Sequence, residues 1–319
     1  MNKTVCVMGS GAWGVALAIH ISHTCKTVWL WSRKECINPT TRIMPRLPCY
    51  ALPENITVSN TFPKKIDLIF LTVPVQFVRS VLPIIPLDIP VVICCKGVET
   101  NSLKFPSEII EEFYPNRLWA VLSGPNFAAE VAQGLPTATV IASRYALLTK
   151  TTASILSTST FRVYANKDPI GVEIGGAAKN VIAIASGATM GAGLGENARA
   201  SLITRGITEL SRLSIGLGGE PNTITGLAGV GDLILTCTGA TSRNYSLGYE
   251  LGKGRHLSDI LKERNTVTEG VLTAPAILQR AKHHKVDTPI IQCVNQLLQG
   301  EITVDIAKEK LMGRPLAHE

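Results

Sequence analysis

The chain has 319 residues, of which 45% are hydrophobic and 17% are charged, and its formal net charge is +7. This length predicts two domains rather than one. The positive charge is compatible with anionic ligands, but the sequence has no basic run with interleaved aromatic residues, so nucleic acid is not an expected partner. No apolar run reaches the roughly 18 residues of a membrane span, so membrane insertion is not expected either.

The eight cysteines show no CxxC pair and no metal-ligand spacing. Cys94 and Cys95 are neighbours in an apolar run and would point to opposite faces of a strand, which suits buried thiols better than a disulfide. His283 and His284 would point about 100° apart on a helix, so no metal site is expected. Strand-like sequence already begins at Val5 and leaves no room for a signal peptide. Together these features predict a cytoplasmic protein.

The first expected strand, residues 4–8, leads into Gly9, Gly11 and Gly14, and a helical pattern follows. Gly9 permits a tight turn, Gly11 lets the backbone approach a pyrophosphate, and Gly14 lets the helix pack against the strand. The helix N-terminus then offers free N–H groups and a partial positive charge. This pattern predicts a dinucleotide site, and a purely structural glycine-rich turn is the alternative.

The second expected strand, residues 27–31, is not followed at once by the acidic residue with which NAD-specific folds bind the adenosine ribose. Arg33 and Lys34 follow it instead. These cations would attract a 2′-phosphate, which an acidic residue would repel, so the pair favours NADPH. Two exposed charges in a loop are the alternative, and Glu35 lies one position too late for the acidic role without being excluded.

The remainder of the first half alternates short apolar runs with helical stretches, which is typical of a sheet wound with helices on both faces. The polar, proline-containing segment 37–61 is expected to be a loop. Ligands bind at the carboxyl ends of the strands in such sheets. Further strands are expected at residues 68–73, 91–95, 119–122 and 139–142.

The pattern changes after about Asp168, where short strands give way to apolar residues at helical spacing, for example over residues 202–217. Thr288 and Pro289 suit the N-cap and first position of a helix that would stop at Gly300. We therefore predict an α/β protein. A Rossmann-type dinucleotide-binding domain would occupy residues 1–167, and an all-helical substrate domain would occupy residues 168–319.

The second half contains two sets of candidate catalytic or binding residues. Lys179 lies among small and apolar residues, so it either extends to the surface from a helix edge or is partly desolvated, which would lower its proton affinity and allow proton exchange near neutral pH. Asp232 follows a glycine-rich turn and is either a site residue or a helix cap. Ser242, Arg243 and Asn244 form either a phosphate site, with forked hydrogen bonds from the guanidinium, or a polar turn.

An ordered set of motifs runs through nearly the whole chain: "GSGAWG", "LPENI", "TVP", "CKGVE", "SGPNFAAEV", "AAKNVIAIASG", "GLAGVGDLILTC", "SRN" and "TVTEG". This set resembles the bacterial NAD(P)-dependent sn-glycerol-3-phosphate dehydrogenases. The resemblance implies reduction of dihydroxyacetone phosphate to sn-glycerol 3-phosphate with NADPH or NADH, for phospholipid synthesis. It also implies a homodimer.

The resemblance implies roles for individual residues. Lys179 would be the proton donor and acceptor, Asp232 would fix its position and charge, and Lys96 would touch both substrate and cofactor. The other implied substrate contacts are Gly124, Asn126, Ser242, Arg243 and Asn244. The other implied cofactor contacts are Ala12, Trp13, Ala128, Arg243, Val267 and Glu269.

The chain departs from the family pattern at three positions. Ala12 stands where the family commonly has Ser, Ala178 replaces a larger apolar residue, and Asn126 is often Ser or Thr. Two other functions remain as alternatives, one because it shares the two-domain architecture and one because of the changes at Ala12 and Ala178. One is a 3-hydroxyacid dehydrogenase, including the 6-phosphogluconate type, whose substrate carries a carboxylate. The other is a non-catalytic NADPH-binding sensor.

Overall fold

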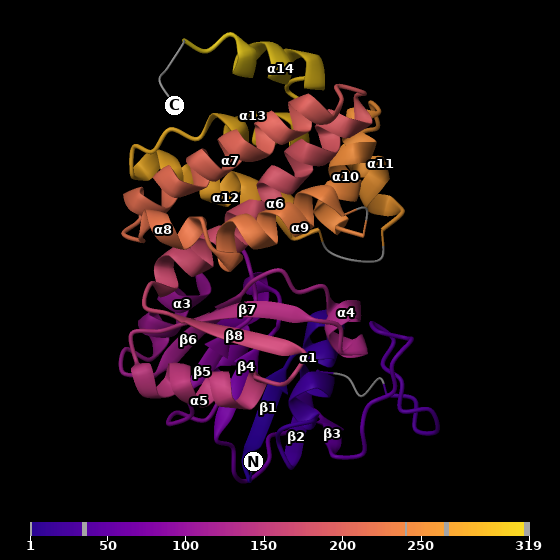
Figure 1. The fold of residues 1–319 in the computed structure, drawn as a ribbon, viewed down its shortest axis with the longest axis vertical. Helices are drawn as coiled ribbons and strands as arrows, with labels where there is room; N and C mark the ends of the chain where they lie inside the picture. Colours follow the sequence, from indigo (N-terminus) through magenta and orange to yellow (C-terminus); the bar gives the residue numbers. More distant parts are fainter. Residues whose placement is uncertain (1, 34–36, 240, 265–267, 316–319) are drawn as a thin grey trace. The chain divides into compact units, whose positions relative to one another are not determined.

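The structure is a computed structural model that describes residues 2–33, 37–239, 241–264 and 268–315 (Figure 1). The chain divides into two compact units. The first comprises Met1–Lys96 and Lys104–Val172, and the second comprises Gly97–Leu103 and Glu173–Glu319. One boundary therefore falls directly after Lys96, and another falls within helix α6 (Pro169–Gly191).

The first unit contains an eight-stranded sheet with the order β3-β2-β1-β4-β5-β6-β7-β8. Strands β1 to β6 pair in parallel, β7 is antiparallel to β6, and β8 is parallel to β7. The predicted α/β class is confirmed. The strands are β1 (Thr4–Met8), β2 (Thr27–Trp31), β3 (Ile56–Ser59), β4 (Leu68–Leu71), β5 (Val91–Ile93), β6 (Trp119–Ser123), β7 (Thr137–Ala142) and β8 (Phe161–Asn166).

Two strands were not predicted, and both lie at sheet edges. β3 falls in the segment predicted as a loop, and β8 has exposed side chains at Arg162 and Tyr164. Edge strands are only partly covered, so they lack the continuous apolar run that marks a central strand. Strand β5 is also shorter than predicted and ends before Cys94 and Cys95, which are nevertheless buried free thiols, as expected.

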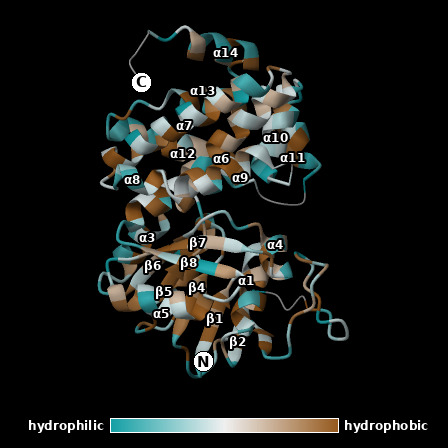
Figure 2. Ribbon diagram, in the orientation of Figure 1, coloured by the Kyte–Doolittle hydropathy of each residue, from teal (hydrophilic) through white to brown (hydrophobic). Residues whose placement is uncertain are grey.

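The core of the first unit lies between the sheet and the helices that cover it. Helix α1 is buried continuously from Gly14 to Ile21, because it packs against β1, β2 and α4. Figure 2 shows the hydrophobic residues concentrated along the strands. The helices of this unit are α1 (Ala12–Ser22), α2 (Val78–Val81), α3 (Pro106–Phe113), α4 (Ala128–Gln133) and α5 (Ala146–Leu156), with 3₁₀ turns at Val75–Phe77 and Leu82–Ile84.

The second unit is helical in every part that the structure assigns to regular structure, as predicted. Helix α13 begins at the expected Pro289 and ends at Leu298. The helices after α6 are α7 (Glu196–Gly216), α8 (Pro221–Ile224), α9 (Asp232–Thr238), α10 (Arg243–Gly252), α11 (Leu257–Lys262), α12 (Glu269–His283), α13 (Pro289–Leu298) and α14 (Val304–Met312), with a π-helical turn at Leu227–Gly231.

Glycines bring α6 and α10 together backbone to backbone. A Cβ added to Gly248 of α10 would lie 2.0 Å from the carbonyl oxygen of Ile184, and one added to Gly187 of α6 would lie 2.0 Å from that of Tyr245. Side chains at these positions would force the helices apart. The contact therefore fixes the position of the first turns of α10 along the axis of α6.

Among the described residues, no single helix is long and apolar enough to cross a membrane, whereas one bent pair, Pro221–Thr238 with Arg243–Gly252, meets the length and composition criteria.

Candidate active site

The glycine turn between β1 and α1 is tightly built. Gly9 has φ +126°, and its N–H donates to the carbonyl of Trp31 at 3.0 Å. A Cβ on Gly14 would lie 1.9 Å from the carbonyl oxygen of Gly9, so no larger residue fits there. The hydroxyl of Thr72 lies 3.0 Å from the carbonyl oxygens of both Met8 and Gly9 and holds the turn from β4. Thr72 is a supporting residue that the sequence analysis did not name.

The N-terminus of α1 is free to receive an anion. Gly11 occupies the N-cap position, no side chain caps the helix, and its first turn has no acidic residue. Ala12 and Trp13 lie in this first turn and are half-buried. The unpaired N–H groups and the helix dipole suit a phosphate at this position.

The end of β2 carries a cation and a hydroxyl rather than a carboxylate. Ser32 is buried, and its Oγ lies 2.7 Å from the Oγ of Ser10 in the glycine turn. The exposed guanidinium of Arg33 lies over the ring of Phe77, 5.9 Å from its centroid. Lys34 lies outside the described residues. The sequence analysis did not name Phe77, whose exposed ring offers a stacking face beside Arg33.

The loop after β6 contains buried polar atoms that lack a protein partner. Gly124 has φ +158°, and a Cβ there would lie 3.0 Å from Thr139. The side-chain amide of Asn126 donates to Thr139 Oγ1 at 3.0 Å, which in turn donates to the carbonyl of Ser123. Asn126 Oδ1 and Ser123 Oγ are buried without a hydrogen-bond partner among the described residues. A polar ligand group would satisfy both atoms, which suits the substrate contact expected of this loop.

Two further predicted residues lie at chain positions that suit a site. Lys96 follows β5 and is half-buried, and the next residue, Gly97, has φ +122°. Ala128 is the first residue of α4. Both therefore follow or border the carboxyl ends of strands, where ligands bind in such sheets.

In the second unit, Lys179 forms a buried ion pair with Asp232. Lys179 is 7% exposed on α6, and Asp232 is 1% exposed at the start of α9. The Lys179 Nζ also donates to Thr236 Oγ1 at 2.8 Å, and that hydroxyl donates to the carbonyl of Asp232 at 2.6 Å. The carboxylate of Asp232 and the hydroxyl of Thr236 therefore hold Nζ at a defined position on α6.

Thr236 is a site residue that sequence reasoning missed. It lies four positions after Asp232 on the same helix, so both side chains share one face. That spacing was readable in the sequence, but the partner on α6 was not. The neighbouring Cys237 is not a candidate nucleophile, because burial raises its pKa to about 12.

The start of α10 combines structural and candidate binding roles. Ser242 is the N-cap, and its Oγ accepts the N–H of Tyr245 at 3.3 Å, so the segment is a helix start rather than a polar turn. Arg243 is exposed in the first turn, and its carbonyl accepts a hydrogen bond from Arg264 at 2.9 Å. Arg243 therefore lies at a helix end whose backbone is stabilised by the Ser242 cap and by the hydrogen bond from Arg264.

Asn244 connects α10 to two other helices. Its amide donates to Asn180 Oδ1 at 2.9 Å, and its Oδ1 accepts the N–H of Gly270 at 3.0 Å. The amide of Asn180 lies 3.4 Å from the carboxylate of Glu269, the first residue of α12. Asn180 is a further residue that the sequence analysis did not name, although it directly follows Lys179. Val267 lies outside the described residues.

Comparisons with known proteins cover both units. Residues 4–148 match the family described as "NAD-dependent glycerol-3-phosphate dehydrogenase N-terminus", and residues 168–309 match its C-terminal counterpart. A glycerol-3-phosphate dehydrogenase [NAD(P)+] from Gluconobacter oxydans is 50% identical over 99% of this chain and 98% of its own length. The chain belongs to the NAD-dependent glycerol-3-phosphate dehydrogenase family. The enzyme of that name from Maricaulis maris is 42% identical, over 99% of this chain and 98% of its own.

Solved structures agree with this family. The crystal structure of glycerol-3-phosphate dehydrogenase from Coxiella burnetii is 33% identical and superposes with a TM-score of 0.93 over 98% of this chain and 99% of that one. A D-mandelate dehydrogenase with NADH is only 15% identical, with a TM-score of 0.60 over 96% of this chain and 99% of that one, and shows a shared fold alone. The comparisons thus favour the glycerol-3-phosphate dehydrogenases over the hydroxyacid alternative.

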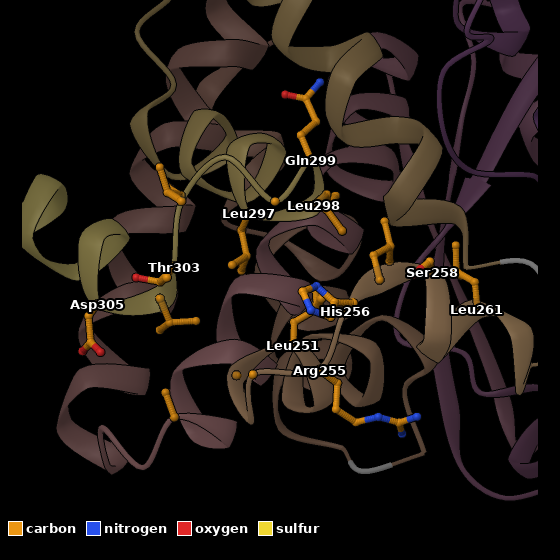
Figure 3. Close-up of a pocket in the computed structure, with 17 residues that line it drawn as sticks. Leu251, Arg255, His256, Ser258, Leu261, Leu297, Leu298, Gln299, Thr303 and Asp305 are labelled. Carbon is orange, nitrogen blue, oxygen red and sulfur yellow. The ribbon is translucent and has the colours of Figure 1, made fainter.

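A cavity of about 750 Å³ in the helical unit includes none of the predicted site residues. Figure 3 shows His256 among Leu251, Leu297 and Leu298 of its lining, whereas the Arg255 side chain points away from them. Arg255 already forms ion pairs with two glutamates. Helix α14 borders the cavity with its first residues and has no buried residue of its own. The cavity therefore lies beside the start of α14, and the predicted site residues of this unit lie outside it.

Proposed function

We propose that this chain reduces dihydroxyacetone phosphate to sn-glycerol 3-phosphate with NADPH or NADH, and catalyses the reverse reaction. The observation that carries the proposal is the buried Lys179–Asp232 ion pair, in a chain matched to the glycerol-3-phosphate dehydrogenases through both of its units. A sensor without turnover would gain nothing from a buried ammonium that is held by a carboxylate and a hydroxyl. The geometry therefore supports an enzyme.

Lys179 is the proposed proton donor. When bound, the reduced nicotinamide supplies a hydride to the central carbon of the substrate. The carbonyl oxygen then takes a proton from the Lys179 ammonium, and solvent reprotonates the amine. Asp232 keeps the lysine charged before the step. Thr236 Oγ1 accepts a second hydrogen bond from Nζ and so helps to fix the position of the amine. In the oxidation direction, the neutral amine takes the proton from the alcohol.

The substrate phosphate is the proposed ligand of the start of α10. Arg243 supplies forked, charge-assisted donors, which suit phosphate better than a single ammonium does. Ser242 and Asn244 flank it on the braced helix end, and Gly124 and Asn126 are the proposed substrate contacts of the other unit. The Lys96 cation is proposed to stabilise negative charge that develops on the substrate oxygen.

The proposed cofactor site is the glycine turn with the end of β2. Gly9, Gly11 and Gly14 make room for the pyrophosphate at the start of α1. Arg33 and the Phe77 ring would take the adenosine end, where a guanidinium favours the 2′-phosphate of NADPH. The other cofactor contacts proposed from the family resemblance are Ala12, Trp13, Lys34, Lys96, Ala128, Arg243, Val267 and Glu269.

The sequence patterns and the family resemblance together support four broader proposals. Residues 1–167 form the dinucleotide-binding domain and residues 168–319 form the substrate and catalytic domain, although each contributes contacts to both ligands. The protein works in the cytoplasm as a homodimer, for which light scattering in solution is the test. Its product feeds phospholipid synthesis.

The first experiment measures absorbance at the reduced-nicotinamide band. Purified protein is mixed with dihydroxyacetone phosphate and either NADPH or NADH, and a carboxylated 3-hydroxyacid with NADP⁺ is run in parallel. Rapid oxidation of NADPH with dihydroxyacetone phosphate is expected. Turnover of the hydroxyacid alone would support the other enzyme class, and cofactor binding without any turnover would support the sensor.

A further inference from the structure

The short segment Gly97–Leu103 connects β5 to α3 in the chain but packs within the helical unit. The boundary between the two units therefore falls on the peptide bond that joins Lys96 to Gly97. Lys96 is the residue to which we assign the stabilisation of charge on the substrate. Whatever fixes this segment also limits where the backbone of Lys96 can lie.

The segment is held in one conformation by buried polar contacts. Glu99 is 6% exposed, and its carboxylate accepts a hydrogen bond from the hydroxyl of Ser102. Leu103 has φ +58°, a left-handed conformation that is costly for a residue with a branched side chain. Its N–H donates to the carbonyl of Glu99 at 2.9 Å. A strained residue persists only when its surroundings over-determine it, so further contacts must hold this turn.

One such contact comes from helix α12. The Nη1 of Arg280 donates to the carbonyl of Leu103 at 2.7 Å, across 177 positions of sequence. The Arg280 side chain is half-buried, and its Nε is buried. Arg280 lies eleven positions after Glu269 on α12, which at 3.6 residues per turn is about three turns and nearly the same face of the helix.

We propose that Arg280 is a positioning residue that fixes Lys96 by holding the segment Gly97–Leu103 in the helical unit. This proposal rests on the proposed function, because it takes the role of Lys96 from there. Arg280 itself touches neither substrate nor cofactor in this scheme. Helix α12 would then carry both a proposed cofactor contact, Glu269, and Arg280, the residue that fixes the position of the Lys96 backbone.

The expected cost of losing Arg280 follows from how sharply charge stabilisation depends on geometry. Displacing a catalytic group by about 1 Å costs on the order of 100-fold in rate. Because Lys96 acts on charge that develops during the reaction, its misplacement lowers kcat more than it raises KM for dihydroxyacetone phosphate. A purely structural role for Arg280 would instead lower the amount of folded protein and leave kcat per folded molecule unchanged.

The test is a double-mutant cycle between Arg280 and Lys96 in the full-length chain. Arg280→Met is expected to lower kcat per folded molecule by roughly 10- to 100-fold, with only a modest loss of stability from the lost hydrogen bond to Leu103. Arg280→Lys, which keeps one charged donor, is expected to recover part of that loss. The matched control is Lys282→Met, an exposed lysine on the same helix, with activity within about twofold of the parent. In a Lys96→Ala background, Arg280→Met is expected to have almost no further effect.

Additive losses in the cycle would overturn the proposal, since they would show that Arg280 does not act through Lys96. Activity of the parent protein on dihydroxyacetone phosphate is measured in the same series, so failure of the proposed function is seen separately. Hydrogen exchange at the Leu103 amide tests the tether without any activity: faster exchange is expected in Arg280→Met and unchanged exchange in Lys282→Met. Unchanged exchange in both variants would also overturn the proposal.

Discussion

At the glycine turn before α1, the groups proposed to bind a ligand are backbone N–H groups, whereas around Lys179 they are side chains. The turn is defined by the absence of side chains at Gly9 and Gly14, where a Cβ would collide with neighbouring atoms. The lysine cluster is defined by three side chains from two helices that satisfy one another. The first arrangement is local in sequence, and the second joins residues more than fifty positions apart.

The two sites are therefore expected to be sensitive to opposite kinds of substitution. A site built from backbone N–H groups survives most side-chain truncations, because every residue type except proline has this donor. It is damaged instead by added atoms that block the approach of the ligand. A buried side-chain site is damaged by removing atoms, because each loss leaves a buried partner unsatisfied. Four substitutions test this contrast, from the largest expected effect to the smallest.

Lys179→Met is expected to lower kcat by at least about 1,000-fold, because the proton donor is lost. It also leaves the buried Asp232 carboxylate unpaired, which costs about 3–5 kcal/mol of unfolding free energy. Turnover, NADPH affinity and denaturant unfolding are measured together. NADPH affinity should change little if the cofactor binds at the glycine turn. The double variant Lys179→Met/Asp232→Asn should regain stability without turnover, and a return of turnover would show that Lys179 is not the proton donor.

Gly248→Ala tests the contact between α10 and α6. The added methyl group would lie 2.0 Å from the carbonyl oxygen of Ile184, so the helices must separate. Overpacking of this kind costs about 1–3 kcal/mol or more in unfolding free energy. The control is Gly226→Ala, whose Cβ would lie 3.4 Å from the nearest atom, the carbonyl oxygen of Thr223. Equal losses in the two variants would show that close approach is not the cause.

Glu209 gives the helical unit a pH-dependent stability. It is fully buried on α7 and accepts the N–H groups of Ile290 and Ile291, at the start of α13, at 2.8 and 2.9 Å. Burial raises its pKa from 4.5 to about 7. Because the folded-state pKa is raised, its stabilisation is present below about pH 4.5 and is lost as pH rises through about 7, by up to about 3 kcal/mol.

Glu209→Gln is therefore expected to flatten the dependence of the unfolding free energy on pH between about 4.5 and 7. The measurement is urea unfolding across this range. The control is Glu196→Gln, an exposed glutamate on the same helix, which should keep the parent slope. A slope that survives in Glu209→Gln would assign the titration to another group.

Arg33→Asp is expected to shift the ratio of NADPH to NADH use toward NADH by roughly 10- to 100-fold, because a carboxylate repels a 2′-phosphate and accepts ribose hydroxyls. The ratio of kcat/KM values for the two cofactors is the measurement. Arg144→Asp, at an exposed arginine after β7, should leave the ratio unchanged. An unchanged ratio in Arg33→Asp would remove the 2′-phosphate from this position.

The predictable parts of the fold were those whose signal is local. The apolar runs of β1, β2 and the central strands, and the Thr288-Pro289 start of α13, each lie within a few residues. The edge strands β3 and β8 were missed, because half-covered strands carry exposed residues such as Arg162 and Tyr164. The antiparallel direction of β7 depends on connectivity, and no run of residues encodes it.

The candidate site shows the same limit. The glycine spacing indicated the cofactor turn directly, but Thr72, which holds that turn, acts across 63 positions. Lys179 and Asp232 were named, whereas Thr236 and Asn180 were not, because their importance lies in partners on other helices. The catalytic and binding roles of these residues stay predictions until the variants above are measured.

The glycine contact between α6 and α10 has a consequence for redesign of substrate preference. Because the two backbones touch at Gly187 and Gly248, neither helix can slide or tilt to accommodate a bulkier substrate. In a directed-evolution library, substitutions at Gly187 and Gly248 are therefore expected to destabilise the protein without changing substrate preference. The exposed Arg243, the proposed phosphate ligand five positions before Gly248 on α10, is the position at which a library is expected to reach new substrate headgroups while the scaffold stays unchanged.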